Sequence, residues 1–341
     1  MKILFTAEHD NNLDKLKELG DVIISGWALG DPKLTEDELI ELAKDCDIII
    51  TSYDDITEKV IVACEQLKLI ACTRATPVNV DCKAATKRNI PVIYTPGRNS
   101  DATAELTIAH MLCVARNIPQ AYMALKNGEY TDANRADLSG DGVQKDAIWD
   151  VTSDSPYEVF KGFELHGKTL GIIGYGSIGR RVGRIARGFG MALAIYDPFL
   201  SAVDVNEPGV KIVSLDELLC HSDFVTLHLK VSESTIGFLN QERIGMMKES
   251  AFLINTSRAA VLDEEAVIEA LRENRIKGAG FDVYAHEPIH ADHPYIKELN
   301  NVTITPHIAG ATVEVLTNHT NMIIDDINRF LKNEPMLHQY N

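Results

Sequence analysis

The sequence predicts an α/β fold made of two doubly wound parallel sheets. Short apolar runs alternate with amphipathic helical patterns along the chain, which is typical of a parallel sheet covered by helices on both faces. A glycine-rich motif lies between a predicted strand and a predicted helix near the middle of the chain. With 341 residues, the chain is long enough for two domains, each with its own core.

The N-terminal part contains the first series of predicted elements. Apolar runs predict strands at 3–7, 22–25, 48–51, 69–72 and 92–94. Amphipathic patterns between them predict helices at 13–19, 36–43 and 59–66. A long helical pattern then covers 101–128, and we expect Pro119 to kink it, because proline lacks the N–H that a helix interior needs.

The second series begins after a polar, turn-rich stretch at 131–160, which we interpret as an irregular excursion. The final stretch, 311–331, is predicted to be helical. Strands are predicted between these two segments, at 169–174, 193–196, 224–229, 251–255, 278–283 and 302–305.

The bulk composition argues against several classes of protein. No apolar run reaches the roughly 18–20 residues of a membrane span, and the N-terminus has the pattern of a strand rather than a signal peptide. The six cysteines show no C-x-x-C spacing, so we expect buried free thiols and a reducing cytoplasm. The formal net charge of −17 argues against a nucleic-acid-binding surface.

The glycine-rich motif is Gly174-Tyr175-Gly176-Ser177-Ile178-Gly179. It follows a predicted strand and precedes a helical pattern, which is the setting of a dinucleotide-binding loop. Gly174 is expected to make the tight turn, Gly176 to let backbone N–H groups approach a pyrophosphate, and Gly179 to let helix and strand pack closely. The N-terminus of the helix, at Ser177 and Ile178, then faces the phosphates with its partial positive charge.

Asp197 ends the strand that follows this helix. In dinucleotide sites, an acidic residue about 20 residues beyond the glycines binds the adenosine ribose. A carboxylate there repels a 2′-phosphate, so the sequence favours NAD over NADP.

Glu287 and His307 form the candidate acid–base pair. Each lies in a turn-rich segment that follows a buried-looking run, at 276–280 and 302–305. Strand ends of this kind hold the reactive side chains of α/β enzymes. A histidine that is hydrogen-bonded to a carboxylate is suited to give or take a proton near neutral pH.

A zinc motif overlaps the first of these segments. His286-Glu287-Pro288-Ile289-His290 matches H-E-x-x-H, and His293 follows. That motif requires a helix, and Pro288 would break one. We therefore expect no metal site and interpret the three histidines as surface-loop residues.

Several motifs together resemble the NAD-dependent D-2-hydroxyacid dehydrogenases, and the resemblance covers nearly the whole chain. They are Gly174 to Gly179, Asn255-Thr256-Ser257-Arg258, Phe281-Asp282-Val283 through Glu287-Pro288, and Pro306-His307-Ile308-Ala309-Gly310-Ala311-Thr312. The resemblance implies a discontinuous, flavodoxin-like substrate domain, 1–103 plus 308–341, and an inserted Rossmann NAD-binding domain, 104–307. It also implies an active site in the cleft between them and a homodimer formed through the NAD-binding domain. The chain ends soon after the final predicted helix, so we expect no appended regulatory domain.

The resemblance assigns roles to residues in the motifs of the second series. Arg258 is expected to bind the substrate carboxylate and polarise the C2 oxygen, His307 to transfer the hydroxyl proton, and Glu287 to stabilise the imidazolium. Asp282 resembles an aspartate near the nicotinamide carboxamide, with a structural role at the strand end as the alternative. Further cofactor-lining positions are implied at Thr103, His228, Thr235 and Thr256.

The substrate loop departs from the family pattern. It is Ala75-Thr76-Pro77-Val78-Asn79-Val80-Asp81, which is shorter than usual and is preceded by Arg74, and Pro77 has no N–H to offer a carboxylate. Arg74, Ala75 and Thr76 are the candidate substrate-binding residues, and Arg74 resembles an arginine of D-3-phosphoglycerate dehydrogenases. It would contact a phosphate or second carboxylate, or else form a structural salt bridge. A phosphoglycerate-type substrate and a hydroxypyruvate- or glyoxylate-type substrate both stay open.

Two further hypotheses concern a contact between subunits and a function other than catalysis. Ile148 and Trp149 are apolar residues in the polar stretch 131–160, which suggests an arm that packs on a partner subunit. Relatives of this family also act as NAD-regulated corepressors, so an NAD-dependent binding protein is the alternative to an enzyme.

Overall fold

The computed structural model describes residues 1–10, 12–131, 153–201, 205, 207 and 209–341. The chain divides into two compact units. The five-stranded unit comprises Met1–Asn99 and Gly310–Asn341, and the seven-stranded unit comprises Ser100–Ala309. The first change of unit coincides with the start of a long helix at Ser100, a few residues before the boundary that the sequence suggested.

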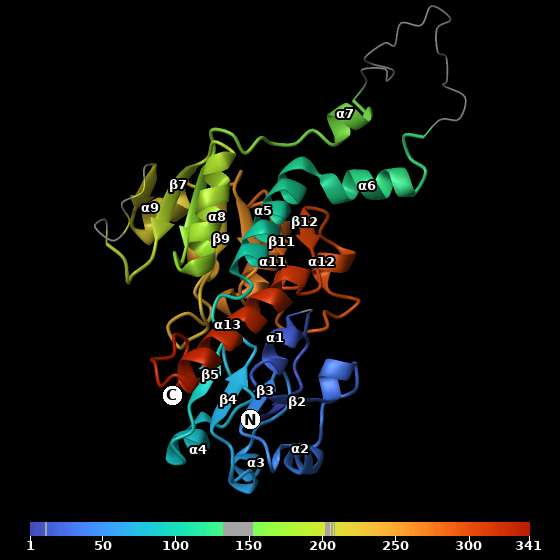
Figure 1. Ribbon diagram of the computed structural model, residues 1–341. Coiled ribbons are helices and arrows are strands. Elements are labelled where there is room, and N and C mark those ends of the chain that lie inside the picture. Colours follow the sequence, from blue (N-terminus) through green and yellow to red (C-terminus); the bar gives the residue numbers. More distant parts are fainter. Residues whose placement is uncertain (11, 132–152, 202–204, 206, 208) are drawn as a thin grey trace, which may run out of the picture. The chain divides into compact units, whose positions relative to one another are not determined.

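The five-stranded unit is built on a parallel sheet (Figure 1). Its strand order is β2 (Asp21–Ile24), β1 (Lys2–Phe5), β3 (Ile48–Thr51), β4 (Leu69–Cys72) and β5 (Val92–Tyr94). Its helices are α1 (Leu13–Lys17), a 3₁₀ helix (Gly26–Leu29), α2 (Glu36–Ala43), α3 (Glu58–Ala63), α4 (Cys82–Lys87) and α13 (Val313–Leu331). Side-chain oxygens of Thr35, Thr57 and Asp81 accept backbone N–H groups at the starts of α2, α3 and α4, which fixes where these helices begin.

The seven-stranded unit is also built on a parallel sheet. Its strand order is β12 (Val302–Ile304), β11 (Gly278–Phe281), β10 (Phe252–Asn255), β9 (Phe224–Leu227), β6 (Thr169–Ile173), β7 (Ala192–Tyr196) and β8 (Val210–Ile212). Its helices are α5 (Ser100–Arg116), α6 (Ile118–Lys126), α7 (Pro156–Val159), α8 (Ser177–Gly188), α9 (Leu215–His221), α10 (Gln241–Gly245), a 3₁₀ helix (Ala259–Val261), α11 (Glu264–Arg272) and α12 (Pro294–Lys297).

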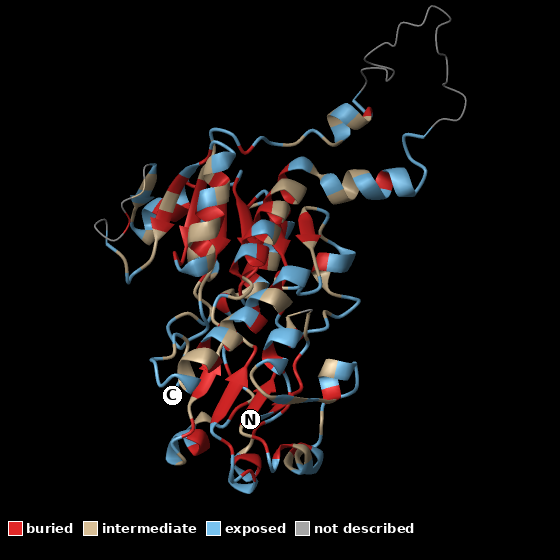
Figure 2. Cartoon of the chain, in the orientation of Figure 1, coloured by how far each residue is buried: buried red, intermediate tan, exposed pale blue. Residues whose placement is uncertain are grey.

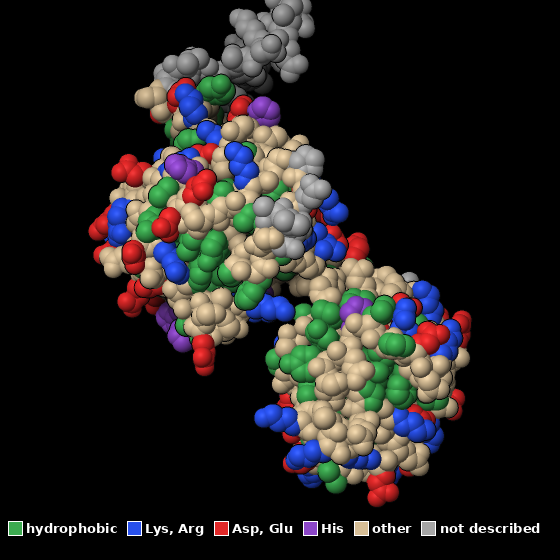
Figure 3. All heavy atoms as spheres, turned by 90° about the vertical axis from the view of Figure 1, so that its left-hand side faces the viewer, with side chains coloured by type: hydrophobic (Ala, Val, Ile, Leu, Met, Phe, Trp, Pro, Cys, Tyr) green, Lys and Arg blue, Asp and Glu red, His purple; other side chains and the backbone are tan. Residues whose placement is uncertain are grey.

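Apolar packing on both sides of each sheet explains the near-continuous apolar strands of the sequence. In both units most strands are buried while the outer helix faces are exposed (Figure 2). The edge strands β2 and β8 are partly exposed. Lys and Arg side chains are interspersed with Asp and Glu on the face shown in Figure 3.

The strand order of the seven-stranded sheet reverses at β6. From β6 the chain adds β7 and β8 on one side, and it then adds β9 on the other side of β6. Ligands of such sheets bind beyond the carboxyl ends of the strands, at this kind of reversal.

The predicted fold class is confirmed, with local differences. The helical pattern at 101–128 is two helices, because Asn117 adopts a left-handed conformation (φ 52°) and ends α5. Pro119 lies in the first turn of α6, where its missing N–H costs nothing, so the predicted kink was wrong. Strand β8 was not predicted. The apolar residues of the proposed arm, Ile148 and Trp149, lie outside the described residues.

The cysteines agree only partly with the prediction of buried free thiols. All six cysteines are free, but Cys220 is exposed, and Cys82 and Cys113 are only partly buried. Among the described residues, no helix is long and apolar enough to span a membrane.

Candidate active site

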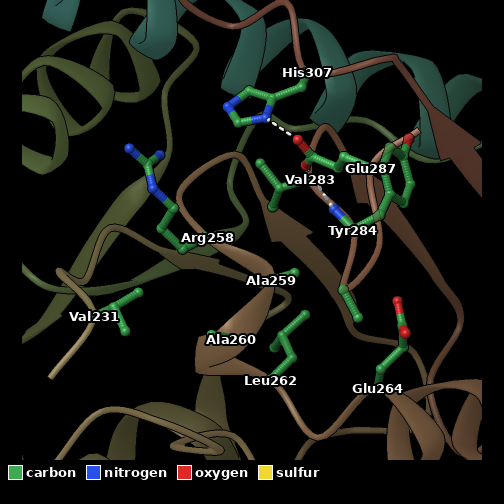
Figure 4. Close-up of a pocket in the computed structure, with 11 residues that line it drawn as sticks. Val231, Arg258, Ala259, Ala260, Leu262, Glu264, Val283, Tyr284, Glu287 and His307 are labelled. Atoms are coloured by element: carbon green, nitrogen blue, oxygen red, sulfur yellow. Dashed lines mark hydrogen bonds and ion pairs between the residues drawn. The ribbon is translucent and has the colours of Figure 1, made fainter. Parts of the chain in front are cut away.

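A pocket of about 440 Å³ opens in the seven-stranded unit, and most of its lining follows strands β10, β11 and β12. Its charged lining includes Arg258, Glu287 and His307, the three residues that the sequence selected as catalytic. Figure 4 shows the Arg258 guanidinium and the His307 ring directed into the same space. The structure therefore brings together residues from three separate strand ends.

Glu287 and His307 are hydrogen-bonded to each other. His307 Nδ1 lies 2.6 Å from Glu287 Oε2, while Glu287 Oε1 accepts the Tyr284 N–H at 3.1 Å. Burial alone would raise the pKa of the Glu287 carboxyl, but the His307 hydrogen bond, the Tyr284 N–H and the charges of His307 and Arg258 together lower it. Because a carboxylate can only accept, His307 carries a proton on Nδ1, and Nε2 is left for proton exchange.

Acidification is expected to remove the contribution of Glu287 to stability. The folded-state pKa of Glu287 lies below its ordinary value of 4.5, so its contribution is complete above that value and is lost as the pH falls through the folded-state pKa. The free energy of unfolding of wild type should therefore exceed that of Glu287→Gln near neutral pH, and the difference should shrink below pH 4.5. Denaturant titrations of both proteins across this range test the sign. A difference that grows on acidification would contradict it.

Asp282, buried at the end of β11, fixes the loop that carries His307. Its Oδ1 accepts the Thr305 hydroxyl at 2.6 Å and the Ile308 N–H at 2.8 Å, and its Oδ2 accepts the Ala309 N–H at 2.8 Å. These bonds flank His307, whose backbone is left-handed (φ 56°), a conformation that costs a non-glycine residue energy. Asp282 therefore holds the backbone on both sides of His307, whereas its predicted contact with the cofactor stays a prediction.

His110 of α5 extends this network and was not found from the sequence. Its Nε2 lies 2.9 Å from the Thr305 hydroxyl. Because that hydroxyl donates to Asp282, His110 donates to Thr305, and His110 Nδ1 is buried without a partner. Burial lowers the pKa of His110, although the charge of Asp282 opposes this. The sequence signal was a histidine within the apolar run from Ile108 to Ala115 of a predicted helix.

Arg258 follows β10 through a turn built by Asn255. The buried Asn255 amide donates to the Arg258 carbonyl at 2.9 Å and accepts the Ser257 N–H at 3.0 Å. Arg258 Nη1 donates to the Ser257 carbonyl at 2.6 Å, and Arg258 forms no ion pair with a described residue. The remaining donors of the exposed guanidinium are thus available to an anion.

The three glycines of the loop between β6 and α8 differ in their surroundings. Gly174 has φ +90°, and a Cβ there would lie 2.6 Å from the His228 carbonyl oxygen. A Cβ on Gly179 would lie 2.3 Å from the Gly174 carbonyl oxygen, so only glycine fits both positions. Gly176 and Ser177 are exposed, and a Cβ on Gly176 would meet nothing within 4 Å. The loop therefore leaves an open approach to the N-terminus of α8, which fits a pyrophosphate.

Asp197 lies beside this loop. Its Oδ2 accepts the Tyr175 N–H at 2.9 Å, and its Oδ1 accepts the Phe199 N–H at 3.0 Å. The carboxylate is therefore held at the end of β7, next to the turn that starts at Gly174. This is the place expected for an adenosine ribose contact.

The other predicted cofactor positions lie in three places. Thr107 joins Thr103 and Thr256, because its hydroxyl lies 2.7 Å from the Thr103 carbonyl and 2.7 Å from the Thr256 hydroxyl. His228 lies behind Gly174, where burial lowers its pKa to about 3 and keeps the ring neutral. The Thr235 hydroxyl donates to the Lys230 carbonyl at 2.6 Å, in a separate turn.

The structure also describes the predicted zinc motif and the predicted substrate loop. The segment from His286 to His290 contains no helical residue, so the two histidines do not share a helix face.

In the five-stranded unit, Ala75 and Thr76 are exposed and follow β4. Arg74 forms no ion pair with a described residue, so the structural salt bridge is not observed.

Comparison with known proteins agrees with this geometry. Residues 108–309 match the family model "D-isomer specific 2-hydroxyacid dehydrogenase, NAD binding domain". The chain is 36% identical over 98% of its length to the D-3-phosphoglycerate dehydrogenase of Methanocaldococcus jannaschii, of which it covers 58%. It is 35% identical over 87% of its length to the glyoxylate reductase of Korarchaeum cryptofilum, of which it covers 83%. Among solved structures, an acyclic imino acid reductase in complex with NADPH and D-Arg is 27% identical, with a TM-score of 0.77 and complete coverage of both chains.

Proposed function

The chain belongs to the D-isomer-specific 2-hydroxyacid dehydrogenase family, and we propose that it interconverts a D-2-hydroxyacid and its 2-keto acid with NAD. The observation that carries this proposal is the hydrogen-bonded pair of Glu287 and His307 in a pocket that Arg258 also lines. A proton donor, a carboxylate that orients it and a free guanidinium are what this reaction requires of a protein.

Each of the three residues has a distinct task. Arg258 offers a planar, permanently charged fork that binds the substrate carboxylate and polarises the C2 oxygen. His307 Nε2 gives the proton to that oxygen during reduction and takes it during oxidation. Glu287 fixes the ring through Nδ1 and stabilises the imidazolium that oxidation creates. When bound, NAD supplies the hydride chemistry.

We assign cofactor binding to the seven-stranded unit and substrate binding to the five-stranded unit. The open loop at Gly176, the start of α8 and the carboxylate of Asp197 support the first assignment. The exposed loop of Arg74, Ala75 and Thr76 is the proposed substrate loop. Thr103, His228, Thr235, Thr256 and Asp282 remain proposed cofactor-lining residues. Free cysteines, including the exposed Cys220, support a reducing cytoplasmic location.

Replacing Asp197 by serine is expected to weaken the preference for NADH over NADPH. The substitution removes a carboxylate that accepts from the ribose and repels a 2′-phosphate, so the ratio of kcat/KM values should fall roughly ten- to hundredfold. Steady-state kinetics with both cofactors measures the ratio. Asp216→Ser, an exposed residue in the first turn of α9, is the matched control and should leave the ratio unchanged. An unaltered ratio in Asp197→Ser would remove Asp197 from the cofactor site.

Several 2-keto acids are candidate substrates. The names of relatives include D-3-phosphoglycerate dehydrogenase, glyoxylate reductase and hydroxypyruvate reductase. A screen of 2-keto acids with NADH, followed at the nicotinamide absorbance, tests the proposed function. Turnover of at least one of them is the expected result. Binding of NAD without turnover of any acid would contradict an enzyme and favour an NAD-regulated binding protein.

We also propose a homodimer formed through the seven-stranded unit. The surface of α6 is largely exposed (Figure 2), although Ile118, Tyr122, Met123 and Leu125 are apolar. Their exposed fractions are 48%, 59%, 51% and 57%. Neighbouring apolar side chains of this size on one short helix indicate a surface that another protein covers.

Introducing a charge on α6 is expected to weaken the dimer. Met123→Glu would have to bury a carboxylate, so the dimer dissociation constant should rise by at least about tenfold. Sedimentation velocity over a range of concentrations measures this change. Val62→Glu, at an exposed apolar position of α3 in the other unit, is the control and should sediment as wild type. A Met123→Glu protein that sediments as wild type would place the dimer contact elsewhere.

A further inference from the structure

Helix α5 packs against the three strands whose ends carry the candidate catalytic residues. It contacts β10, β11 and β12 (Figure 1). The helix can approach β11 closely because that strand has glycine at position 280, where a Cβ would lie 2.9 Å from the His110 Cβ. Through this close packing, the His110 ring reaches Thr305, the residue that directly follows β12.

A separate hydrogen bond fixes α5 against the turn that precedes Arg258. The Thr107 hydroxyl donates to the Thr103 carbonyl one helical turn earlier, so it accepts the Thr256 hydroxyl at 2.7 Å. Thr107 and Thr256 are both buried. Since this bond holds the helix independently of His110, the loss of the His110 side chain should leave α5 in place.

His110 is buried in a defined protonation state. Only 2% of the residue is exposed, and burial lowers its pKa, so the ring is neutral near pH 7. Its Nε2 donates to the Thr305 hydroxyl at 2.9 Å, because that hydroxyl gives its own proton to Asp282. The one proton of the neutral ring is therefore on Nε2, and the buried Nδ1 has no partner within the described chain.

Packing alone does not explain a histidine at this position. A buried acceptor such as Nδ1 that forms no hydrogen bond is unfavourable. A leucine side chain would fill a similar space without that cost. His110 does not line the pocket, so any effect that it has on the reaction passes through Thr305. The Nε2–H bond is thus the feature that distinguishes His110 from an apolar residue.

Thr305 connects His110 with the loop that carries His307. Its carbonyl accepts the His307 N–H at 3.0 Å, and its hydroxyl donates to Asp282 at 2.6 Å. Asp282 in turn accepts the N–H groups of the two residues that follow His307, both at 2.8 Å. The left-handed backbone of His307 (φ 56°) is unfavourable for a residue other than glycine, so its position depends on these bonds.

We propose that His110 is a positioning residue for proton transfer by His307, an assignment that rests on the proposed function. Its Nε2–H keeps the Thr305 hydroxyl directed at Asp282, and Asp282 holds the backbone on both sides of His307. This series of hydrogen bonds limits the positions that His307 Nε2 can take relative to the substrate oxygen. Proton transfer depends strongly on that geometry, whereas the affinities for the acid and for NADH do not.

The first experiment compares side chains that can and cannot donate to Thr305. His110→Leu removes the donor, His110→Gln places an amide N–H near the position of Nε2, and His110→Asn is too short to reach it. With the best keto acid from the screen, kcat should fall about tenfold in His110→Leu and His110→Asn, the effect of one hydrogen bond, and recover in His110→Gln. KM for the acid and the dissociation constant of NADH should stay close to their wild-type values.

Two further substitutions test the route through Thr305. Thr305→Val removes the hydroxyl that links His110 to Asp282, so adding His110→Leu to it should lower kcat little further. Thr303→Val is the matched control, because the Thr303 hydroxyl belongs to the neighbouring strand β12 and is buried without a partner within the described chain. It should keep the wild-type kcat.

Three results would overturn the assignment. They are a wild-type kcat in His110→Leu, equal values in His110→Gln and His110→Asn, and fully additive losses in the double variant of His110 and Thr305. Denaturant titrations show whether each variant is folded. A purely structural role would lower the free energy of unfolding and leave kcat unchanged. If His110→Leu does not fold, His110→Asn takes its place.

Nitrogen NMR of histidine-labelled protein tests the assignment without turnover. The signals of His110 and His307 are identified by their loss in His110→Gln and His307→Ala. Near pH 7, His110 should be neutral with its proton on Nε2, and the His307 signals should shift in His110→Leu but not in Thr303→Val. A neutral His110 protonated on Nδ1, or His307 signals that are the same in His110→Leu and wild type, would contradict the positioning role. If the wild type reduces no keto acid, the proposed function fails, while these spectra still decide the role of His110.

Discussion

Replacing His307 by alanine is expected to lower kcat by about 10²- to 10⁴-fold, the usual contribution of a positioned general acid or base. The reason is that no other imidazole of the described residues lines the pocket, and the neighbouring Glu287 is held as a carboxylate that cannot donate. NADH affinity should be nearly unchanged, because the glycine loop and Asp197 are separate from this pair. Stopped-flow single turnover, combined with fluorescence titration of NADH, separates the two quantities.

Two companion variants make this result specific. Glu287→Gln keeps the size of the side chain but removes its charge, so it should lose less kcat than His307→Ala while leaving the ring less well oriented. His290→Ala removes an exposed histidine of the same segment that does not line the pocket, and it should behave as wild type. A His307→Ala enzyme with a near-wild-type kcat would show that the proton comes from another group.

The sequence predicted most strands because the signals for them are local. Apolar runs such as 48–51 and 69–72 are fully buried strands in both prediction and structure. The β8 strand is only three residues long and partly exposed, so its pattern could not be distinguished from a loop. The break between α5 and α6 depends on the left-handed backbone of one residue, Asn117, which periodicity does not reveal.

Residues of the candidate site could be predicted where a side chain suited to acid–base chemistry follows a predicted strand. Glu287 and His307 could be paired because each follows a buried strand of the same sheet, and the structure brings them within hydrogen-bonding distance. The hydrogen-bond network that holds the His307 loop in place could not be predicted from local signals. The bond between His110 and Thr305 joins residues 195 positions apart, and only the packing of α5 against the sheet brings them together.

Replacing Arg258 by alanine is expected to lower kcat/KM by roughly 10²- to 10⁴-fold, which corresponds to two hydrogen bonds to a charged group at 1.5–3 kcal/mol each. Arg258 is the residue in the pocket that can hold a carboxylate in a bidentate manner, since its remaining donors are free after the bond to Ser257. The loss should appear both in KM, because the substrate carboxylate is released, and in kcat, because the C2 oxygen is no longer polarised. Steady-state kinetics with the best acid from the screen measures both.

Arg258→Lys decides whether charge or geometry matters more. Lysine retains the positive charge but presents a single point of contact, so it should recover KM more than kcat if alignment of the C2 oxygen depends on the fork. Arg272→Ala removes an exposed arginine of α11 that pairs with Glu298, and it should change neither parameter. Equal activities of Arg258→Ala and wild type would contradict the mechanism, because Glu287 and His307 alone provide proton transfer but no means of holding the acid in place.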